Sequence, residues 1–481
     1  MNKLEFLCIG FVLLGLPTFA QSATNADNAT AARKLLRQPQ WQQTEFSICF
    51  FDLAAGKKVF SFNAARPLIP ASNMKLVTSA AAINLLGEEF VFKTPILIAG
   101  GNLVVLGSGD PVIGDLRIAK QEGKSTDHIF KKIYEALVRR NIDQIDGQII
   151  VDASLFDDVR FHPSWPQNQA DKWYTAQVSA VNFNNNCLNV TFNPGKKAGK
   201  PITYSLSPDT RYANIKSKCK TVGKGSNKIG ASRKLETNYI TLRGTCRKAQ
   251  TINVTIDRPS AYFGYLLGEY LVARGIAIRG DMVVLDNPFV FNVHAAKVPL
   301  YEYSTPLPKV LNRCNQNSLN MAAECLFKTL GAYCGNSPGH PPRQGSWQSG
   351  RVAVEGFLKK IDIPTGEYAI DDGSGLSRKN RVSARALVQI LTHAWRQPYR
   401  EMFRNSLANP KNGTLSKRGR FKRNDYEGRI YAKTGYISKA WALSGYCRTR
   451  DDRWLAFSII ANKGKQSPRN LIDALVKEII K

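Results

Sequence analysis

The chain has 481 residues, of which 43% are hydrophobic, and its 67 Lys and Arg residues against 37 Asp and Glu residues give a formal net charge of +30. A chain of this length and apolar content can bury a large core in about two or three structural units, which excludes an intrinsically disordered protein. The positive charge predicts attraction to polyanions.

The N-terminal segment, residues 1–20, is predicted to be a secretory signal peptide. Lys3 precedes an apolar run from Phe6 to Leu16, and small residues lead to a cleavage site near Ala20. We therefore expect an exported protein, periplasmic or otherwise outside the cytoplasm, that is soluble or peripherally associated with a membrane. An uncleaved N-terminal anchor is the alternative. No later stretch reaches the ~18 consecutive apolar residues typical of a transmembrane helix.

A β-hairpin and a buried helix are the first folded elements predicted. Residues 45–62 contain two apolar runs separated by a turn with Gly56, which is typical of a hairpin. The apolar run from Leu76 to Leu86 ends at Gly87, which predicts a core helix.

Ser72 and Lys75 lie at the start of this helix, in the stretch 70–75. Residues three apart lie on one helix face, so the lysine amine can reach the serine hydroxyl and activate it without a histidine. The spacing alone is weak evidence, because Ser217 and Lys220 share it in a basic stretch that we expect to be a loop.

An inserted region is predicted at residues 96–289, as one or two small domains between the two parts of the main domain, residues 21–95 and 290–481. Within it, residues 137–152 resemble residues 271–286, and each segment has the pattern of a helix end, a turn and a strand. The stretch 196–232 between them is rich in Gly, Lys and Ser, which predicts exposure.

The C-terminal third returns to longer elements. Helices are predicted over residues 309–331, 348–358 and 383–395, the last with Ser383 as its N-cap. Three strands, 429–434, 441–448 and 454–462, precede a final helix from about Pro468. A hairpin and helix at one end, completed by helices and strands at the other, predict one domain interrupted by an insertion.

Eight cysteines remain after removal of the signal peptide, and an oxidising compartment permits disulfides among them. We favour Cys219 with Cys246, which bracket a Gly-, Lys- and Ser-rich excursion; the alternative is that most of the cysteines are buried free thiols. The chain has no Cys-x-x-Cys pair and its histidines are scattered, so neither a metal nor a cofactor is expected.

Two further motifs follow Ser72 and Lys75 in the chain. Ser318-Leu319-Asn320 lies in a helical stretch, and Lys433-Thr434-Gly435 lies in a predicted strand. Together the three motifs are close to the Ser-x-x-Lys, Ser-Asp-Asn and Lys-Thr-Gly set of penicillin-interacting serine enzymes, with Leu319 in place of the aspartate.

With these motifs the chain resembles the class C low-molecular-mass penicillin-binding proteins, the serine D-alanyl-D-alanine carboxypeptidases and endopeptidases. The likeness extends over most of the mature chain and includes the stretches 107–111, 372–378 and 413–415. It implies an α/β (α+β) fold, a β-lactamase/transpeptidase-like domain whose central antiparallel sheet is flanked by helices and interrupted by a large mixed insertion.

The resemblance also implies roles for individual residues. Ser72 would be the acylated nucleophile and Lys75 its proton acceptor, with a pKa lowered by burial and by the charge of Lys433. Ser318 would relay a proton to the leaving amine, and Asn320 would orient Lys75 and the substrate.

Substrate binding is assigned by the same resemblance to Lys433, Thr434 and Gly435, which would hold the terminal carboxylate of the substrate. The backbone N–H groups of Ser72 and Tyr436 would form the oxyanion hole. Tyr436 departs from the family pattern, which more often has a small hydroxyl residue at this position.

Each assignment has a structural alternative. Ser318 and Asn320 could be ordinary polar residues at a helix start, and Lys433 a surface residue of a strand. The stretch 372–375 is either a tight turn or a structural border of the active site.

The expected function is that of a serine D-alanyl-D-alanine carboxypeptidase and/or endopeptidase that acts on peptidoglycan stem peptides and is inhibited by penicillin. A β-lactamase or esterase on the same fold and a non-catalytic cell-wall-binding protein are the alternatives. The sequence contains no zinc-finger spacing and no RNA-binding aromatic signature, so no specific nucleic-acid partner is expected. An anionic cell-wall or membrane surface is the expected attractor of the positive charge; the alternative is a solvated basic surface without a partner.

Overall fold

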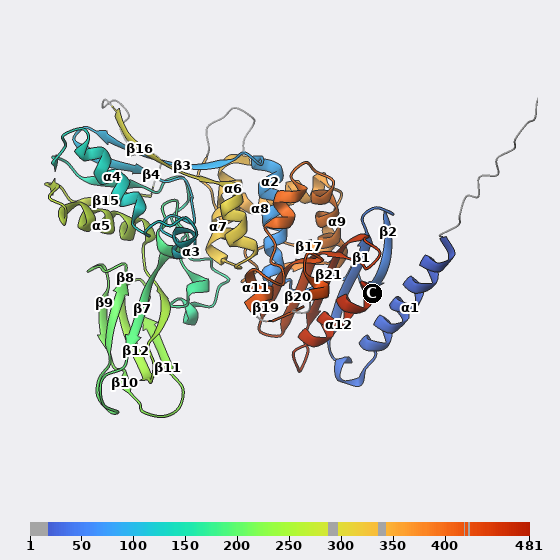
Figure 1. The fold of residues 1–481 in the computed structure, drawn as a ribbon. Coiled ribbons are helices and arrows are strands. Elements are labelled where there is room, and N and C mark those ends of the chain that lie inside the picture. The colour runs from blue at the N-terminus through green and yellow to red at the C-terminus, as the bar shows by residue number, and fades with distance from the viewer. Residues whose placement is uncertain (1–17, 287–296, 335–342, 418, 422–423) are drawn as a thin grey trace, which may run out of the picture.

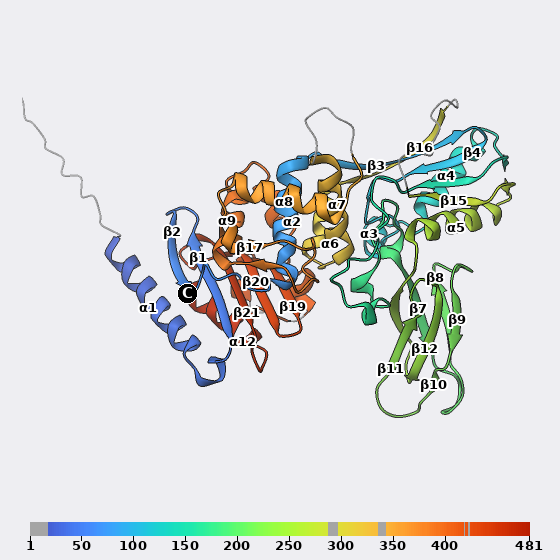
Figure 2. The same cartoon turned by 180° about the vertical axis from the view of Figure 1, so that it is seen from behind.

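The computed structural model describes residues 18–286, 297–334, 343–417, 419–421 and 424–481. Figure 1 shows two lobes that lie side by side, and Figure 2 shows the same arrangement from behind. One lobe contains the first and last described residues, 18 and 481, and the other is formed by the middle of the chain. The predicted boundary at residues 289/290 lies outside the described residues, as does most of the predicted signal peptide, and the boundary at 95/96 stays a prediction.

The lobe with the chain ends, called the transpeptidase lobe below, is built on a five-stranded antiparallel sheet. Its strands, in spatial order, are β19 (Ile430–Ile437), β20 (Ala440–Arg448), β21 (Trp454–Asn462), β1 (Glu45–Asp52) and β2 (Lys57–Phe62). The hairpin and the three C-terminal strands are therefore confirmed. The first and last parts of the chain meet where β1 pairs with β21, and the rings of Phe50 and Phe457 stack there at 5.5 Å.

Helices cover both faces of this sheet, as predicted. Helices α1 (Thr18–Leu36) and α12 (Arg469–Ile479) share one apolar core with strands β1, β19, β20 and β21. The opposite face carries α2 (Met74–Leu86), α6 (Leu307–Asn315), α7 (Asn320–Cys334), α8 (Trp347–Lys360) and α9 (Ala384–Trp395). A sheet with apolar side chains on both faces requires cover on both sides, which explains the three layers.

Helix α2 lies in the middle of its layer. Its residues from Met74 to Ile83 are all buried, which confirms the predicted core helix and its end at Gly87. Helix α9 begins as predicted, because the Ser383 hydroxyl accepts a hydrogen bond from the Ala386 N–H. The predicted helix over residues 309–331 is two helices, because the chain turns between α6 and α7 at Ser318, whose φ is +60°.

A second five-stranded sheet lies in the inserted region and extends beyond its predicted bounds, since β3 begins at Val91 and β16 spans Lys297–Pro306. Its strands, in spatial order, are β15 (Met282–Leu285), β6 (Ile149–Asp152), β4 (Asn102–Leu106), β3 (Val91–Ala99) and β16 (Lys297–Pro306). The two similar segments lie next to each other: α4 (His128–Val138) leads to β5 (Gln144–Ile145) and β6, and α5 (Pro259–Val272) leads to β14 (Ala277–Ile278) and β15. Strand β14 pairs with β5 and β15 with β6, both in parallel, so equivalent strands of the two segments are neighbours.

A β-arm projects from the inserted region (Figures 1 and 2). One of its sheets has the order β13 (Gln250–Thr255), β7 (Cys187–Asn193) and β8 (Thr203–Ser207). The other contains β9 (Asn214–Ser217), β10 (Lys220–Thr221), β11 (Lys228–Arg233) and β12 (Tyr239–Cys246). Buried residues of both sheets, including Phe192 and Leu242, belong to one core.

Two sequence-based expectations about this arm are wrong. The stretch from Ser217 to Lys220 is not a simple loop, because Ser217 ends β9 and Lys220 begins β10. The predicted Cys219–Cys246 disulfide is not formed, and all eight cysteines in the described residues are free thiols. In the parallel pairing of β10 with β12, Cys246 lies opposite Thr221, two residues beyond Cys219. Seven of the eight thiols are buried, as the alternative stated.

The remaining regular elements are short. They are α3 (Leu116–Gln121), β17 (Tyr368–Ala369), β18 (Arg381–Val382), α10 (Arg400–Asn405) and α11 (Gly413–Lys417), with short 3-10 helices that include η2 (Ala71–Asn73) and η4 (Trp173–Thr175). Across the described residues, each helix is either too short or too polar to cross a bilayer.

Candidate active site

Ser72 lies on η2, the short turn that precedes α2, next to the edge strand β19 of the main sheet. The Asn73 side chain fixes this turn to the strand, since its Nδ2 donates a hydrogen bond to the Lys433 carbonyl oxygen at 2.8 Å. Gly435 permits the close approach, because a Cβ there would lie 2.8 Å from the Pro70 carbonyl oxygen. The serine is therefore held between a buried helix and a rigid strand.

Lys75 is completely buried one turn after Ser72, and its ammonium group has three hydrogen-bond acceptors. Nζ donates to Ser72 Oγ at 3.2 Å, to Asn320 Oδ1 at 2.6 Å and to the Ser374 carbonyl oxygen at 2.8 Å. Burial lowers the pKa of Lys75 to about 8, against the opposing effects of Cys314, Glu324 and Asp372. A lysine with this pKa is partly neutral near neutral pH and can accept a proton.

Ser318 and Lys433 meet on the other side of the site. Lys433 Nζ donates a hydrogen bond to Ser318 Oγ at 2.9 Å and another to the Thr434 carbonyl oxygen at 2.9 Å. The Thr434 hydroxyl contacts the hydroxyl of Thr414, on α11, at 2.8 Å. The turn between α6 and α7 thus brings the second motif onto the strand that carries the third.

The structure therefore brings together every side chain that the sequence analysis named for the site. Ser72 and Lys75 come from η2 and α2. Ser318 comes from the turn before α7 and Asn320 from the first residue of α7. Lys433, Thr434 and Gly435 come from β19. Tyr436 follows on β19; its side chain is 51% exposed and packs against the Trp441 ring at 5.8 Å between centroids. The second Ser-x-x-Lys match, Ser217 and Lys220, lies in the β-arm and is not part of this group.

The loop 372–375 borders the site, which is one of the two alternatives stated for this stretch; the other was a tight turn alone. Its Ser374 carbonyl accepts the hydrogen bond from Lys75, and a Cβ on Gly375 would lie 1.8 Å from the Ala71 carbonyl oxygen. Glu324 holds the loop from behind, because its carboxylate accepts hydrogen bonds from the N–H groups of Gly373 and Ser374 at 3.0 and 2.7 Å. Burial, with the nearby charge of Asp372, raises the pKa of Glu324 to about 7.

The inserted region also reaches the site, a contribution that the sequence analysis missed. The Tyr174 carbonyl oxygen, on η4, accepts a hydrogen bond from Asn320 Nδ2 at 2.8 Å. A backbone carbonyl has no residue-specific signature, so no sequence motif could have indicated this contact. The amide of Asn320 is held from both ends, by Tyr174 and by Lys75.

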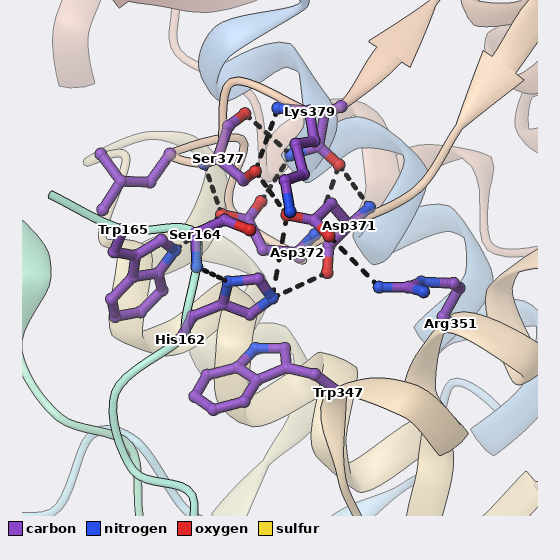
Figure 3. Close-up of polar contacts among 12 residues, drawn as sticks. His162, Ser164, Trp165, Trp347, Arg351, Asp371, Asp372, Ser377 and Lys379 are labelled. Carbon is purple, nitrogen blue, oxygen red and sulfur yellow. Dashed lines mark hydrogen bonds and ion pairs between the residues drawn. The ribbon is translucent and has the colours of Figure 1, made fainter.

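A second contact from the inserted region is made through Trp165 and His162 (Figure 3). The Trp165 indole Nε1 donates a hydrogen bond to Asp372 Oδ2 at 2.8 Å, and His162 Nε2 lies 3.1 Å from the Asp371 carbonyl oxygen. Asp372 in turn accepts hydrogen bonds from the N–H groups of Gly375 and Ser377, both at 2.7 Å. The shape of the loop beside Lys75 therefore depends on both lobes.

No set of three or more His, Cys, Asp or Glu side chains in the described part of the chain is arranged to hold a metal ion. The residues that surround Ser72 are instead proton donors, proton acceptors and hydrogen-bond partners. Such a group can carry out acyl transfer through a serine ester.

Comparison with known proteins agrees with this arrangement. The model of the D-Ala-D-Ala carboxypeptidase 3 (S13) family matches residues 29–479. A D-alanyl-D-alanine carboxypeptidase of an Actinomadura species is 29% identical over 461 residues, which cover 91% of this chain and 81% of that protein. The D-alanyl-D-alanine carboxypeptidase DacB of Haemophilus influenzae is 24% identical over 505 residues, which cover 97% and 96%.

The fold has a solved counterpart as well. The crystal structure of penicillin binding protein 4 from Haemophilus influenzae superposes with a TM-score of 0.76 at 21% identity and covers 94% of this chain and 99% of that one. The same protein in complex with a β-lactam superposes with a TM-score of 0.71. The predicted mixed α/β fold is therefore confirmed, including its large insertion.

Proposed function

Because the chain belongs to the D-Ala-D-Ala carboxypeptidase 3 (S13) family, we propose that it hydrolyses D-alanyl-D-alanine bonds of peptidoglycan stem peptides through an acyl-enzyme on Ser72. As a carboxypeptidase it would release the terminal D-alanine. As an endopeptidase it would cut the bond between a D-alanine and the side-chain amine of a neighbouring stem. Both reactions form the same ester and differ only in the leaving amine.

The first step transfers the acyl group to Ser72. Neutral Lys75 accepts the proton of the Ser72 hydroxyl, and Oγ attacks the carbonyl carbon of the penultimate D-alanine. The backbone N–H groups of Ser72 and Tyr436 stabilise the oxyanion, a contribution whose loss typically costs about 2.7–4 kcal/mol per donor. The C–N bond then breaks, and the leaving amine takes a proton delivered through Ser318.

The second step returns the enzyme to its starting state. A water molecule gives a proton to the basic group and attacks the ester carbonyl, and the bond to Ser72 Oγ breaks as the serine regains its proton. Lys75 is suited to serve both steps, because burial keeps its pKa at about 8. Asn320 holds the amine in line with Ser72 in each of them.

Recognition of the terminal carboxylate is assigned to β19. Lys433 supplies the charge and Thr434 a hydroxyl, and Gly435 lets the strand that carries them lie against Pro70, next to Ser72. A β-lactam presents a carboxylate and a reactive amide in the same relative positions as the peptide, so penicillin is expected to acylate Ser72 and inhibit the enzyme.

One observation carries this proposal: Lys75 Nζ contacts Ser72 Oγ, Asn320 Oδ1 and the Ser374 carbonyl oxygen while buried. A lysine that served only to stabilise the fold would be expected to have a carboxylate as its partner, because an unpaired buried charge is costly. Here the hydrogen-bond partners are neutral, and one of them is the hydroxyl of the nucleophile.

Export and attraction to anionic partners are also proposals. The signal-like segment 1–20 supports export to the periplasm or another extracytoplasmic compartment, in a soluble or peripheral form. The net charge of +30 supports association with an anionic cell-wall or membrane surface.

The test is incubation of the purified protein with cross-linked and uncross-linked muropeptides, in which free D-alanine and dimer cleavage are measured separately. Release of D-alanine, cleavage of dimers, or both, with loss of activity in Ser72→Ala, is the expected result. A protein that is acylated by penicillin and rapidly releases it would instead be a β-lactamase. A Ser72→Ala variant with full cellular function would indicate a non-catalytic wall-binding protein.

A further inference from the structure

The charge of the protein is concentrated in one part of the fold. Residues 194–250 of the β-arm, called the basic arm below, contain 14 Lys and Arg side chains and two acidic ones, Asp209 and Glu236. The segment therefore has a formal charge of +12, against +30 for the whole chain, although it is only 57 of the 481 residues.

Of these 14 cations, only Arg233 and Arg247 donate side-chain hydrogen bonds within the described arm, to the carbonyl oxygens of Thr237 and Gly225. Thirteen of the 14 are exposed, the exception being Arg233. Among the residues that the structure describes, Arg233 is also the one member of the 14 that forms an ion pair, to Asp257 at 3.6 Å. Uncompensated exposed charges repel one another, so a concentration of them lowers the stability of a free domain and is favoured by an anionic partner.

Three segments, residues 196–200, 220–228 and 246–248, meet at the free end of the arm, where β10 lies (Figures 1 and 2). The Gly199 N–H donates to the Thr221 carbonyl oxygen at 2.9 Å, and the Val222 N–H donates to the Cys246 carbonyl oxygen at 3.0 Å. Asn227 Nδ2 donates to the Lys248 carbonyl oxygen at 2.9 Å. These contacts hold together the segments that carry eight exposed cations. The eight are called the distal cluster: Lys196, Lys197, Lys200, Lys220, Lys224, Lys228, Arg247 and Lys248.

The chemistry of the distal cluster narrows the choice of partner. Its three segments contain no acidic residue and none of the exposed large apolar or aromatic side chains of the molecule. Proteins that bind single-stranded nucleic acid stack bases on exposed aromatic rings, and segments that insert into a membrane surface present apolar side chains. Neither is found here.

The cations themselves are mostly lysines. Seven of the eight are Lys and one is Arg. Arginine forks recognise phosphate in fixed geometry, whereas lysine acts as a mobile point charge. The lysine-rich distal cluster is therefore better suited to bind a flexible polymer with widely spaced single charges than a polymer with a dense array of phosphates.

We propose that the distal cluster docks the protein on the carboxylate-bearing peptidoglycan polymer whose stem peptides the active site cleaves. This inference rests on the proposed function for the identity of the polymer. Every uncross-linked stem ends in a free D-alanine carboxylate, so the substrate is itself a polyanion. The arm and the active site bind separate stems of one polymer, and the second contact raises the effective concentration of substrate at Ser72.

The experiment compares two variants of equal charge. In the first, four exposed lysines of the distal cluster are replaced: Lys196→Gln, Lys197→Gln, Lys224→Gln and Lys248→Gln. In the control, four exposed lysines elsewhere that form no ion pair in the described structure are replaced: Lys57→Gln, Lys120→Gln, Lys359→Gln and Lys465→Gln. Both variants lose four charges, so only the location differs.

Binding is measured by co-sedimentation with purified insoluble peptidoglycan, with Ser72→Ala added to each protein so that the polymer stays intact. The distal variant is expected to bind at least about tenfold more weakly than the control at low salt, since surface cations close to a polyanion each add to its electrostatic attraction. The difference should shrink near 0.5 M salt, where the Debye length falls below about 5 Å. Equal melting temperatures establish that both variants are folded.

Three results separate the possibilities. Equal binding by the distal and control variants would overturn the docking proposal. Lysine-dependent binding to vesicles of phosphatidylglycerol and phosphatidylcholine without lysine-dependent binding to peptidoglycan would overturn it too, and would assign the cluster to a membrane. Turnover of a short soluble D-alanyl-D-alanine peptide, measured with proteins that keep Ser72, tests the proposed function separately. The rate of turnover should be equal in both variants. If the parent protein does not cleave the peptide, the proposed function is wrong, but the measured binding to peptidoglycan still holds.

Discussion

Asn320 Nδ2 donates a hydrogen bond to the Tyr174 carbonyl oxygen at 2.8 Å, and this contact joins the transpeptidase lobe to the inserted region. The other end of the same amide, Oδ1, lies 2.6 Å from Lys75 Nζ. A backbone carbonyl can only accept a hydrogen bond, so Tyr174 determines which end of the Asn320 amide faces the lysine. The inserted region thus orients a residue of the proposed catalytic group.

Penicillin is expected to label Ser72 and not Ser217. Both serines precede a lysine by three residues, but only Ser72 has a buried lysine within 3.2 Å and the Asn320 and Lys433 groups nearby. Peptide mapping after reaction with labelled penicillin gives the position of the adduct. Ser72→Ala should abolish labelling and Ser217→Ala should leave it unchanged; an adduct on any other residue would contradict the assignment of the nucleophile.

The rate of acylation should rise with pH through about 8. Burial lowers the pKa of Lys75 to about 8, and the amine can take the Ser72 proton only in its neutral form, which becomes the major form above that pH. Stopped-flow measurement of β-lactam acylation as a function of pH is the direct check. A rate that is constant from about pH 6 to about pH 9 would show that Lys75 is not the proton acceptor.

Ser318→Ala should slow turnover of a peptide by roughly 10²–10⁴-fold, the usual contribution of a positioned acid or base. A thioester substrate is the comparison, because a thiolate leaves without needing a proton. The substitution should therefore slow turnover of the thioester much less than turnover of the peptide. The fold should be unaffected, since serine and alanine both have a Cβ and meet a similar backbone restriction at the φ of +60° that Ser318 adopts. Equal losses for peptide and thioester, or a large fall in melting temperature, would indicate a structural residue.

Lys433→Ala should be severely impaired towards peptides with a free terminal carboxylate. Removing one partner of a buried charge pair commonly costs about 2–5 kcal/mol, which is roughly 30- to several-thousand-fold in kcat/KM. A peptide that ends in D-alaninamide lacks the carboxylate and should be a poor substrate that is less sensitive to the substitution. The four values of kcat/KM form a double-mutant cycle, and simple additivity would rule out contact between Lys433 and the carboxylate.

Trp165→Phe should lower kcat, and it should lower the melting temperature as well, because Trp165 is buried and donates to a buried carboxylate. The substitution removes the indole donor to Asp372, and hydrogen bonds to charged groups are worth about 1.5–3 kcal/mol. Asp372 shapes the loop whose Ser374 carbonyl holds Lys75, so the pH profile of acylation should shift as well. Trp173→Phe is the matched control, because Trp173 is in the same part of the insertion and is 43% exposed. If the Trp165 variant has the same kcat and pH profile as this control, the contact between Trp165 and Asp372 does not position the loop.

Local patterns predicted much of the fold correctly. The hairpin 45–62, the buried helix 76–86, the Ser383 cap and the three C-terminal strands all depend on residue spacing and on caps within short segments. The three motifs were found for the same reason, because each is only a few residues long. Their grouping around Ser72 followed from the resemblance, and the distances now show that the groups are in contact.

The errors and omissions all concern partners that are distant in the sequence. The Cys219–Cys246 pairing is wrong because strand register places Cys246 opposite Thr221, and register depends on how whole strands pack rather than on which residues bracket a loop. The break at Ser318 was missed because the helical periodicity continues across it, although the chain turns there to reach Lys433.

The sequence by itself determined which short segments form helices and strands, which residues could supply the chemistry, and that the chain carries an excess of positive charge. Only the tertiary structure decided that the Tyr174 carbonyl and the Trp165 indole hold the site from the insertion, and that eight cations gather at the free end of the arm. The physical reason is that secondary structure follows from interactions between neighbours in the chain. The active site follows instead from the packing of segments hundreds of residues apart, and the charged surface from the pairing of strands that are tens of residues apart.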